Sequence, residues 1–231
     1  MRFTWLNDFL DLIFPRCCEV CGTALHDQEI CFCLVCEGQL PKASFHLRAM
    51  DNELTVKLQG LMLVNRVISF LRFTKKGVSQ KLLHKLKYQH KPEIAVHLGT
   101  LYGLELSKMN YVSEWDVIVP VPLHPLKLKR RGYNQSEKFA LGLSNSLGIK
   151  VQDLLIRKVF TETQTKKSRL QRLENVEEVF DLKINQNLNG AKILLVDDVI
   201  TTGATLIACA QVLLANGAKH VDLATIAAGG K

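Results

Sequence analysis

The chain has 231 residues, of which 47% are hydrophobic and 23% are charged, and its formal net charge is +8 at neutral pH. This composition supports a buried core and excludes a disordered chain. The length fits one large domain, or a small module joined to a domain of ordinary size. The positive charge favours an anionic partner, such as a phosphorylated sugar, a nucleotide or a nucleic acid, and does not choose among them.

The first fifteen residues predict a short amphipathic helix that ends before Pro15. Asp8 and Asp11 interrupt its apolar residues and no small-residue cleavage site follows, so we expect no secretory signal. We expect the apolar side to pack on the protein itself, although contact with a membrane surface is the alternative. No stretch reaches the roughly 20 apolar residues that span a bilayer, so the expected location is the cytoplasm.

Six of the seven cysteines lie between residues 17 and 36, which favours metal ligation over a disulfide scaffold. Four of them form two Cys-x-x-Cys pairs, Cys18 with Cys21 and Cys33 with Cys36. Two such pairs are typical of a closed structural zinc site, whose role is in folding rather than catalysis. Cys17 and Cys31 lie close enough to leave the choice of ligands open, and reduced cysteines in a small core are the alternative.

After a polar connection over 41–53, the segment from Leu54 to Pro92 has no acidic residue. We expect it to contain a strand over 69–73 and a helix from Val78, with a second helix continuing to about Met109. Nine basic residues lie in the segment: Lys57, Arg66, Arg72, Lys75, Lys76, Lys81, Lys85, Lys87 and Lys91. A basic face is usually only solvated. Here the lack of counter-charges and the nearby rings of Phe70, Phe73 and Tyr88 make a nucleic-acid or polyphosphate surface an equal alternative to a solvated face.

A buried strand is expected over 115–124, followed by a loop with the basic residues Lys127, Lys129, Arg130 and Arg131. Asn134 and Glu137 predict the start of the next helix through a capping box, and Gly148 its end. A polar, basic segment over 161–172 suits either a loop that closes over a ligand or an ordinary surface loop.

The stretch 193–205 predicts a strand, a loop and a helix in that order. Ile193 to Val196 fit a strand buried on both faces, and Asp197 and Asp198 follow directly. The next loop consists of Thr201, Thr202, Gly203, Ala204 and Thr205. Its backbone amides and hydroxyls suit a phosphate at a helix N-terminus, whereas the carboxylates suit ribose hydroxyls or Mg²⁺. An ordinary buried strand that ends in a glycine turn is the alternative. One more buried strand is expected over 221–227.

The stretch resembles the signature of type I phosphoribosyltransferases. That family holds the 5-phosphate of phosphoribosyl pyrophosphate (PRPP) in the loop and the ribose hydroxyls on the acidic pair. The whole chain resembles the ComF family. Besides this stretch, the resemblance rests on the double Cys-x-x-Cys and on the motifs at residues 86–88, 119–122, 131–135, 164–172 and Asn175. The resemblance implies an α/β fold, with a type I phosphoribosyltransferase-like parallel sheet flanked by helices. It also implies a small four-cysteine zinc-binding module over 1–48 ahead of the main domain over 49–231.

The same resemblance implies roles for residues and partners. The acidic pair would be catalytic, residues 120–124 would correspond to the pyrophosphate region, and Lys127, Arg130 and Arg131 would supply its positive charge, with Mg²⁺ accompanying PRPP. Members act on or near incoming single-stranded DNA in natural transformation, which implies single-stranded DNA and other DNA-uptake proteins as partners. Three functions stay open: a PRPP-binding protein that handles DNA without turnover, an active phosphoribosyltransferase with an unknown acceptor, and a PRPP-sensing regulator.

Overall fold

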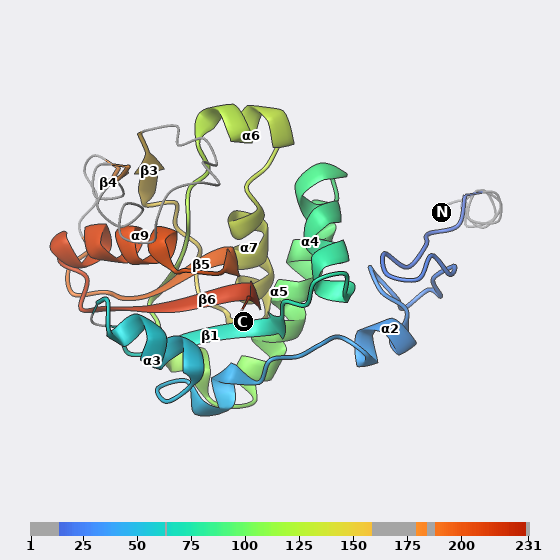
Figure 1. Ribbon diagram of the computed structural model, residues 1–231, viewed down its shortest axis with the longest axis horizontal. Coiled ribbons are helices and arrows are strands. Elements are labelled where there is room, and N and C mark those ends of the chain that lie inside the picture. Colours follow the sequence, from blue (N-terminus) through green and yellow to red (C-terminus); the bar gives the residue numbers. More distant parts are fainter. Residues whose placement is uncertain (1–13, 63, 159–178, 184–187, 230–231) are drawn as a thin grey trace, which may run out of the picture.

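The computed structural model describes residues 14–62, 64–158, 179–183 and 188–229 (Figure 1). The helix expected near the N-terminus, the polar basic segment over 161–172 and Asn175 lie outside these residues. Among the described helices, none has the length and apolar character needed to cross a membrane.

The centre of the fold is a four-stranded parallel sheet with the strand order β1-β6-β5-β2. Its strands are β1 (Val67–Arg72), β2 (Val117–Pro120), β5 (Lys192–Ile200) and β6 (His220–Ala228). The strands are rich in β-branched and aliphatic residues because helices cover both faces. The predicted parallel sheet flanked by helices is therefore confirmed.

Alternating residues of β2 and of 193–196 in β5 enter two separate hydrophobic layers, as the two-residue period of a strand requires. One layer contains the helices α4 (Val78–Tyr88), α5 (Pro92–Ser107) and α7 (Gln135–Leu147), and the other contains α3 (Glu53–Gln59) and α9 (Ala204–Ala215). The smaller elements are α2 (Leu34–Gly38), the 3₁₀ helices Phe45–Arg48 and Tyr111–Ser113, α6 (Pro125–Arg131), and the hairpin of β3 (Leu155–Arg157) with β4 (Phe180–Leu182).

Two glycines fix the position of α7 against α5. A Cβ at Gly99 would lie 2.4 Å from the carbonyl oxygen of Phe139, and one at Gly142 would lie 2.1 Å from that of Val96. The two backbones therefore touch, with no room for a side chain between them. This contact holds the N-terminus of α7, with Asn134 as its cap, at the carboxyl end of the sheet.

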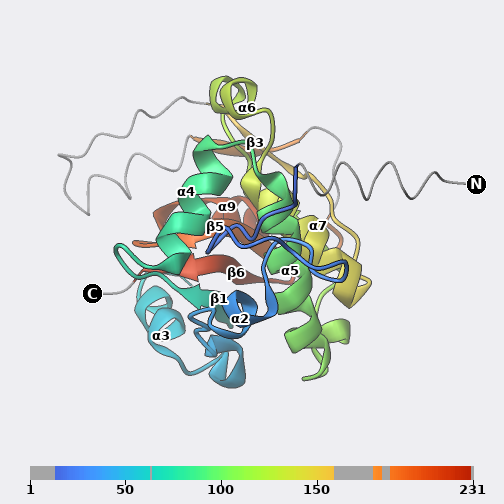
Figure 2. The ribbon, with the colours of Figure 1, turned by 90° about the vertical axis from the view of Figure 1, so that its right-hand side faces the viewer.

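The cysteine-rich segment lies against α4 and α5 (Figure 2). Its buried residues Cys18, Phe32 and Leu40 belong to the same hydrophobic layer as Ile94 and Leu98 of α5. We propose a boundary after residue 48, between the cysteine-rich module and the main domain. The two modules share one hydrophobic layer.

Three expected elements differ from the structure. The strand over 115–124 is only four residues long, since Pro120 and Pro122 have no amide hydrogen for a ladder. The expected basic loop over 125–131 is the helix α6, with Pro125 in its first turn and Gly132 at its end with φ +79°. The strand expected over 193–196 continues to Ile200.

Candidate functional site

The acidic pair lies on a part of β5 whose edge is open on one side. The ladder between β2 and β5 ends where Pro120 pairs with Val196, and the last bond runs from the Val121 amide to the Val196 carbonyl at 2.9 Å. Beyond that point, within the part of the chain that the structure describes, β5 pairs with β6 alone as far as Ile200. Asp197 and Asp198 thus follow the point where β2 leaves the sheet, and this is where parallel α/β folds bind ligands.

Asp197 is half-buried and is held by two donors. The Ser136 hydroxyl donates to its Oδ1 at 2.8 Å, and so does the Asp198 amide, also at 2.8 Å. Burial and the adjacent Asp198 carboxylate raise the pKa of Asp197 to about 7. At neutral pH this carboxyl is therefore close to the midpoint of its titration.

Asp198 pairs with Lys87 from the last turn of α4, with 2.8 Å between Nζ and Oδ2. Both side chains are largely buried, with Lys87 at 26% exposure and Asp198 at 15%. The main chain beside Lys87 is held by Tyr133, whose hydroxyl donates to the Leu86 carbonyl. The contact joins α4 to the end of β5, two elements that lie far apart in the sequence.

Five cationic side chains form what we call the cation group: Lys87, Lys127, Arg130, Arg131 and Arg157. Burial and the other four charges lower the pKa of Lys127, which shows that the group shares one region. Arg131 donates to Gln135 Oε1 at 2.9 Å and lies 5.9 Å above the ring of Tyr88. The structure therefore brings all three predicted basic residues, Lys127, Arg130 and Arg131, to the region of the acidic pair.

The predicted phosphate loop lies between β5 and α9. Gly203 is the residue before the helix and has φ +85°, which favours glycine. A Cβ there would lie 2.5 Å from Leu58 Cδ2. Ala204 opens the helix, and the Lys57 ammonium donates to the Thr201 carbonyl at 2.8 Å. The amides of 202–205 are thus at a helix N-terminus, with Thr201, Thr202 and Thr205 adding hydroxyls.

The charges of the acid-free segment 54–92 are mostly paired. Five of its nine basic residues have carboxylate partners from other parts of the chain: Arg66, Arg72, Lys85, Lys87 and Lys91. Lys57 and Lys81 donate to backbone carbonyls. The expectation of nine charges without counter-charges was therefore wrong, because a sequence segment does not show its tertiary partners.

The expected stacking role of Phe70 was also wrong. Its ring is 1% exposed and stacks on Tyr102 inside the core, with centroids 5.0 Å apart. Phe73 packs against the core and is partly buried. Tyr88 is 54% exposed, and it lies beside the cation group through Arg131.

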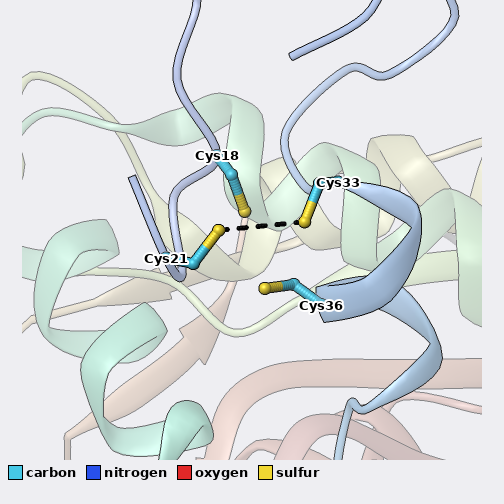
Figure 3. Close-up of side chains that lie close together, drawn as sticks. All are labelled: Cys18, Cys21, Cys33 and Cys36. Carbon is cyan, nitrogen blue, oxygen red and sulfur yellow. Dashed lines mark hydrogen bonds between the residues drawn. The ribbon is translucent and has the colours of Figure 1, made fainter. Parts of the chain in front are cut away.

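The thiols of Cys18, Cys21, Cys33 and Cys36 converge on one point (Figure 3). All four sulfur atoms lie within 4.8 Å of one another, and 3.8 Å separates those of Cys21 and Cys33. Zinc bound tetrahedrally at about 2.3 Å from each sulfur would place sulfurs about 3.8 Å apart, so the four residues fit the ion. Hydrogen bonds with the hydroxyl and amide of Thr23 lower the pKa of Cys21 to about 6, which suits a metal ligand, whereas burial and the three neighbouring thiols raise the pKa of Cys36 to about 12.

The two surplus cysteines lie outside this cluster. Cys17 is exposed and its thiol contacts the Pro15 carbonyl, whereas Cys31 is buried and its carbonyl accepts a bond from the Glu19 amide. Burial raises the pKa of the Cys31 thiol to about 12. Neither residue belongs to the four-sulfur arrangement.

Two residues near the acidic pair were not predicted. Ser136 stands in the capping segment of α7, where a hydroxyl is ordinary and gives no signal of contact with Asp197. Arg157 lies on the short strand β3, where burial lowers the pKa of its guanidinium and the charge of Asp197 acts in the opposite direction. Neither follows from sequence spacing, because α7 and β3 reach the site only through the packing of the sheet.

A model of the phosphoribosyl transferase domain matches residues 133–231. The DNA utilization protein YhgH of Salmonella typhimurium is 36% identical over 146 residues, 62% of this chain and 63% of that protein. The chain thus matches less than two thirds of that relative's length. Competence protein F of Haemophilus influenzae is 31% identical over 147 residues, 62% of this chain and 64% of that protein. Competence protein ComFC of Bacillus subtilis is 29% identical over 215 residues, 93% of this chain and 84% of that protein.

Similar solved structures include the glutamine PRPP amidotransferase from B. subtilis, at 20% identity and a TM-score of 0.42, over 62% of this chain and 30% of that one. A purine phosphoribosyltransferase from Pyrococcus horikoshii shows 22% identity and a TM-score of 0.36, over 56% of this chain and 73% of that one. The domain model covers the part of the chain that contains α7, β5, α9 and β6. The chain is therefore similar to the ComF-type competence proteins, and its second half matches the phosphoribosyl transferase domain.

Proposed function

We propose that this competence-type protein binds PRPP at the carboxyl end of β5. The observation that carries the proposal is the position of Asp197 and Asp198 between two groups that suit phosphates. The N-terminus of α9 follows them closely in the chain, and the cation group from α4, α6 and β3 reaches them through the contact of Lys87 with Asp198 and the charge of Arg157 near Asp197. A ligand with a phosphate at each end and hydroxyls between them matches this order of charges.

In this proposal each part of the site holds one part of PRPP. The loop of Thr201, Thr202, Gly203, Ala204 and Thr205 takes the 5-phosphate, and the two carboxylates accept hydrogen bonds from the ribose hydroxyls. Lys127, Arg130 and Arg131 take the pyrophosphate with Lys87 and Arg157. Mg²⁺ bound with the pyrophosphate would reduce the charge that these side chains must neutralise.

Calorimetry with parts of the ligand tests this arrangement. PRPP with Mg²⁺ is expected to bind more tightly than ribose 5-phosphate or pyrophosphate, because only the whole molecule reaches both phosphate regions. Ribose 5-phosphate tests the α9 loop and pyrophosphate tests the cation group. Equal affinity for PRPP and for free pyrophosphate would show that the acidic pair and the α9 loop contribute nothing.

We further propose that the protein handles single-stranded DNA in natural transformation, together with other DNA-uptake proteins. The printed names of the relatives, competence protein and DNA utilization protein, support this role, as does the net charge of +8. We propose for the strand a surface made of the exposed Lys129 and Arg130 of α6 and the exposed ring of Tyr88, which lies beside Arg131 of the same helix. It combines positive charge with an aromatic platform, as single-strand binding requires.

Turnover of PRPP is the second candidate. Displacement at the anomeric carbon would release pyrophosphate into a region that the cation group neutralises, and Asp197 would face the positive charge that develops on the sugar. A screen for pyrophosphate release across nucleobases and single-stranded DNA tests it. Release with any acceptor establishes the enzyme, and its absence with all of them favours binding without turnover.

For the cysteine cluster we propose a structural zinc ion held by Cys18, Cys21, Cys33 and Cys36. The cluster has four ligands and leaves no open position for a substrate. Reduced, clustered cysteines are typical of a reducing compartment, which supports a cytoplasmic location.

A further inference from the structure

The helix α4 contacts both the cysteine module and the proposed PRPP site. Glu19 stands between the metal-binding positions Cys18 and Cys21, and its carboxylate reaches across to α4 and the residue before α5. Oε2 accepts from the Lys85 ammonium at 2.8 Å, and Oε1 accepts from the Lys91 ammonium at 3.0 Å. The two contacts lie on either side of Lys87, which pairs with Asp198.

Other contacts restrain the same region. Lys81 donates to the Val20 carbonyl at 2.5 Å, so the cysteine loop is bound to α4 one turn further back as well. The Glu19 side chain is only 12% exposed, which makes its ion pairs stronger than those of the molecular surface. Glu19 itself is fixed by its position in the loop and by the bond from its amide to the Cys31 carbonyl at 2.9 Å.

We propose that Glu19 is a positioning residue. When zinc orders the cysteine module, Glu19 fixes the end of α4 that holds Lys87, and Lys87 contacts the proposed ligand site. The inference rests on the proposed binding of PRPP and adds a role for the module beyond its own folding. When the cysteine loop is ordered, Glu19 holds the last turn of α4 from both sides. When it is not, Lys85 and Lys91 lose their shared partner and the backbone that carries Lys87 is freer to move.

The substitution Glu19→Gln tests this because electrostatics alone predicts the opposite result. Loss of one negative charge would attract a phosphorylated anion more strongly, whereas loss of the positioning contact weakens binding. We expect the Kd for PRPP with Mg²⁺ to rise about fivefold or more, the lower part of the usual range of coupling between sites. Zinc content should stay at the wild-type level, because the four thiols are unchanged.

Glu37→Gln is the matched control. Glu37 belongs to the same module and pairs with a helix, but its partner is His97 of α5 at 3.2 Å rather than α4. It makes the same change of charge and should leave the Kd near the wild-type value. A wild-type Kd in Glu19→Gln would overturn the positioning role, and so would an equal loss of affinity in both variants.

Hydrogen exchange of residues 82–91 tests the role without any ligand. In zinc-loaded protein, exchange there should be faster in Glu19→Gln than in the wild type or Glu37→Gln. Lys85→Gln removes one contact from the α4 side, leaves the cysteine loop intact, and should show the same faster exchange even if Glu19→Gln loses zinc. Unchanged exchange in Lys85→Gln contradicts the proposal. Failure of the wild type to bind PRPP would refute the proposed function and leave this result to decide the positioning role.

Discussion

Lys87 and Asp198 form an ion pair across 2.8 Å that joins the end of α4 to the end of β5. In the proposed complex the Lys87 ammonium contacts two anionic groups, the Asp198 carboxylate and the pyrophosphate of PRPP. The pair therefore makes α4 part of the site, although the residues predicted to hold PRPP all lie after residue 119.

Replacement of Lys87 by Gln should weaken PRPP binding by about 10- to 100-fold, since a hydrogen bond to a charged group contributes about 1.5–3 kcal/mol. The loss has two sources, the missing contact with the pyrophosphate and the Asp198 carboxylate left without its cation. Calorimetry with PRPP and Mg²⁺ measures it. Lys75→Gln, which removes the same charge from an exposed position just before α4, is the control and should bind like the wild type.

PRPP affinity should depend on pH through Asp197. Because its pKa is raised to about 7, the protonated form predominates below neutrality, whereas the ribose hydroxyls need the carboxylate. One carboxyl with this pKa weakens binding by about tenfold between pH 8 and pH 6. The sign is opposite for the ligand-free protein: the folded state favours the proton, so this group's contribution to stability is lost as the pH rises from about 4 through 7.

Two variants separate this effect from titration of the ligand's own phosphates. Asp197→Asn should retain only the pH dependence that belongs to PRPP. Ser136→Ala removes a hydrogen bond that lowers the pKa of Asp197, so the midpoint should move to higher pH. An identical pH profile in the wild type and in Asp197→Asn would show that Asp197 is not the titrating group.

Substitution of Gly203 by Ala should destabilise the protein and displace the loop before α9. The residue has φ +85°, and the new Cβ would approach Leu58, which is 1% exposed and has little room to move. We expect a loss of about 1–3 kcal/mol in the free energy of unfolding, measured with urea, together with weaker binding of ribose 5-phosphate. Gly190→Ala has a similar φ of +74° but meets no atom within 4 Å. A loss as large at Gly190 would mean that the backbone, not Leu58, causes the effect.

Zinc analysis of cysteine variants tests the choice of ligands. The wild type and Cys17→Ser should each contain one zinc ion per chain, because the exposed Cys17 thiol lies outside the cluster. Cys21→Ser and Cys33→Ser should bind zinc much more weakly and lose it to a chelator. Retention of zinc by Cys21→Ser with its loss from Cys17→Ser would reverse the assignment.

Single-stranded DNA binding should depend on α6. Lys129→Gln with Arg130→Gln should weaken it and reduce the slope of log affinity against log salt by about 1.4, since each contacted phosphate contributes about 0.7. Lys150→Gln with Lys219→Gln removes two exposed charges beside the opposite, amino end of the sheet and serves as the control. Equal losses in the two pairs would indicate a general effect of net charge.

The sequence predicts the local elements of this fold well, and the tertiary partners poorly. Local sequence patterns are enough to predict two elements. The apolar run 193–196 predicts the strand β5, and Asn134 and Gly148 predict the two ends of the helix α7. Asn134 accepts from the Ser136 amide. The helix α6 was missed because its basic residues lack an apolar period, although Pro125 and Gly132 mark its two ends.

The partners could not be predicted because they depend on how distant segments come together. Lys87 and Asp198 meet across the sheet, and the two oxygens of Glu19 reach lysines that lie far along the chain. The same cause explains the error about the basic segment over 54–92. A segment that contains no acidic residue can still have its basic residues paired, because carboxylates from other parts of the chain pack against it.

The most direct test of the central proposal is calorimetry of PRPP binding, with Mg²⁺, to Asp197→Asn with Asp198→Asn. Asp153→Asn with Asp181→Asn, which removes two carboxylates from surface ion pairs, makes an equal change of charge. We predict that the first pair loses at least about 100-fold in affinity, because each hydrogen bond to a charged group contributes about 1.5–3 kcal/mol, and that the second binds like the wild type. Full affinity in Asp197→Asn with Asp198→Asn would contradict the assignment of the site.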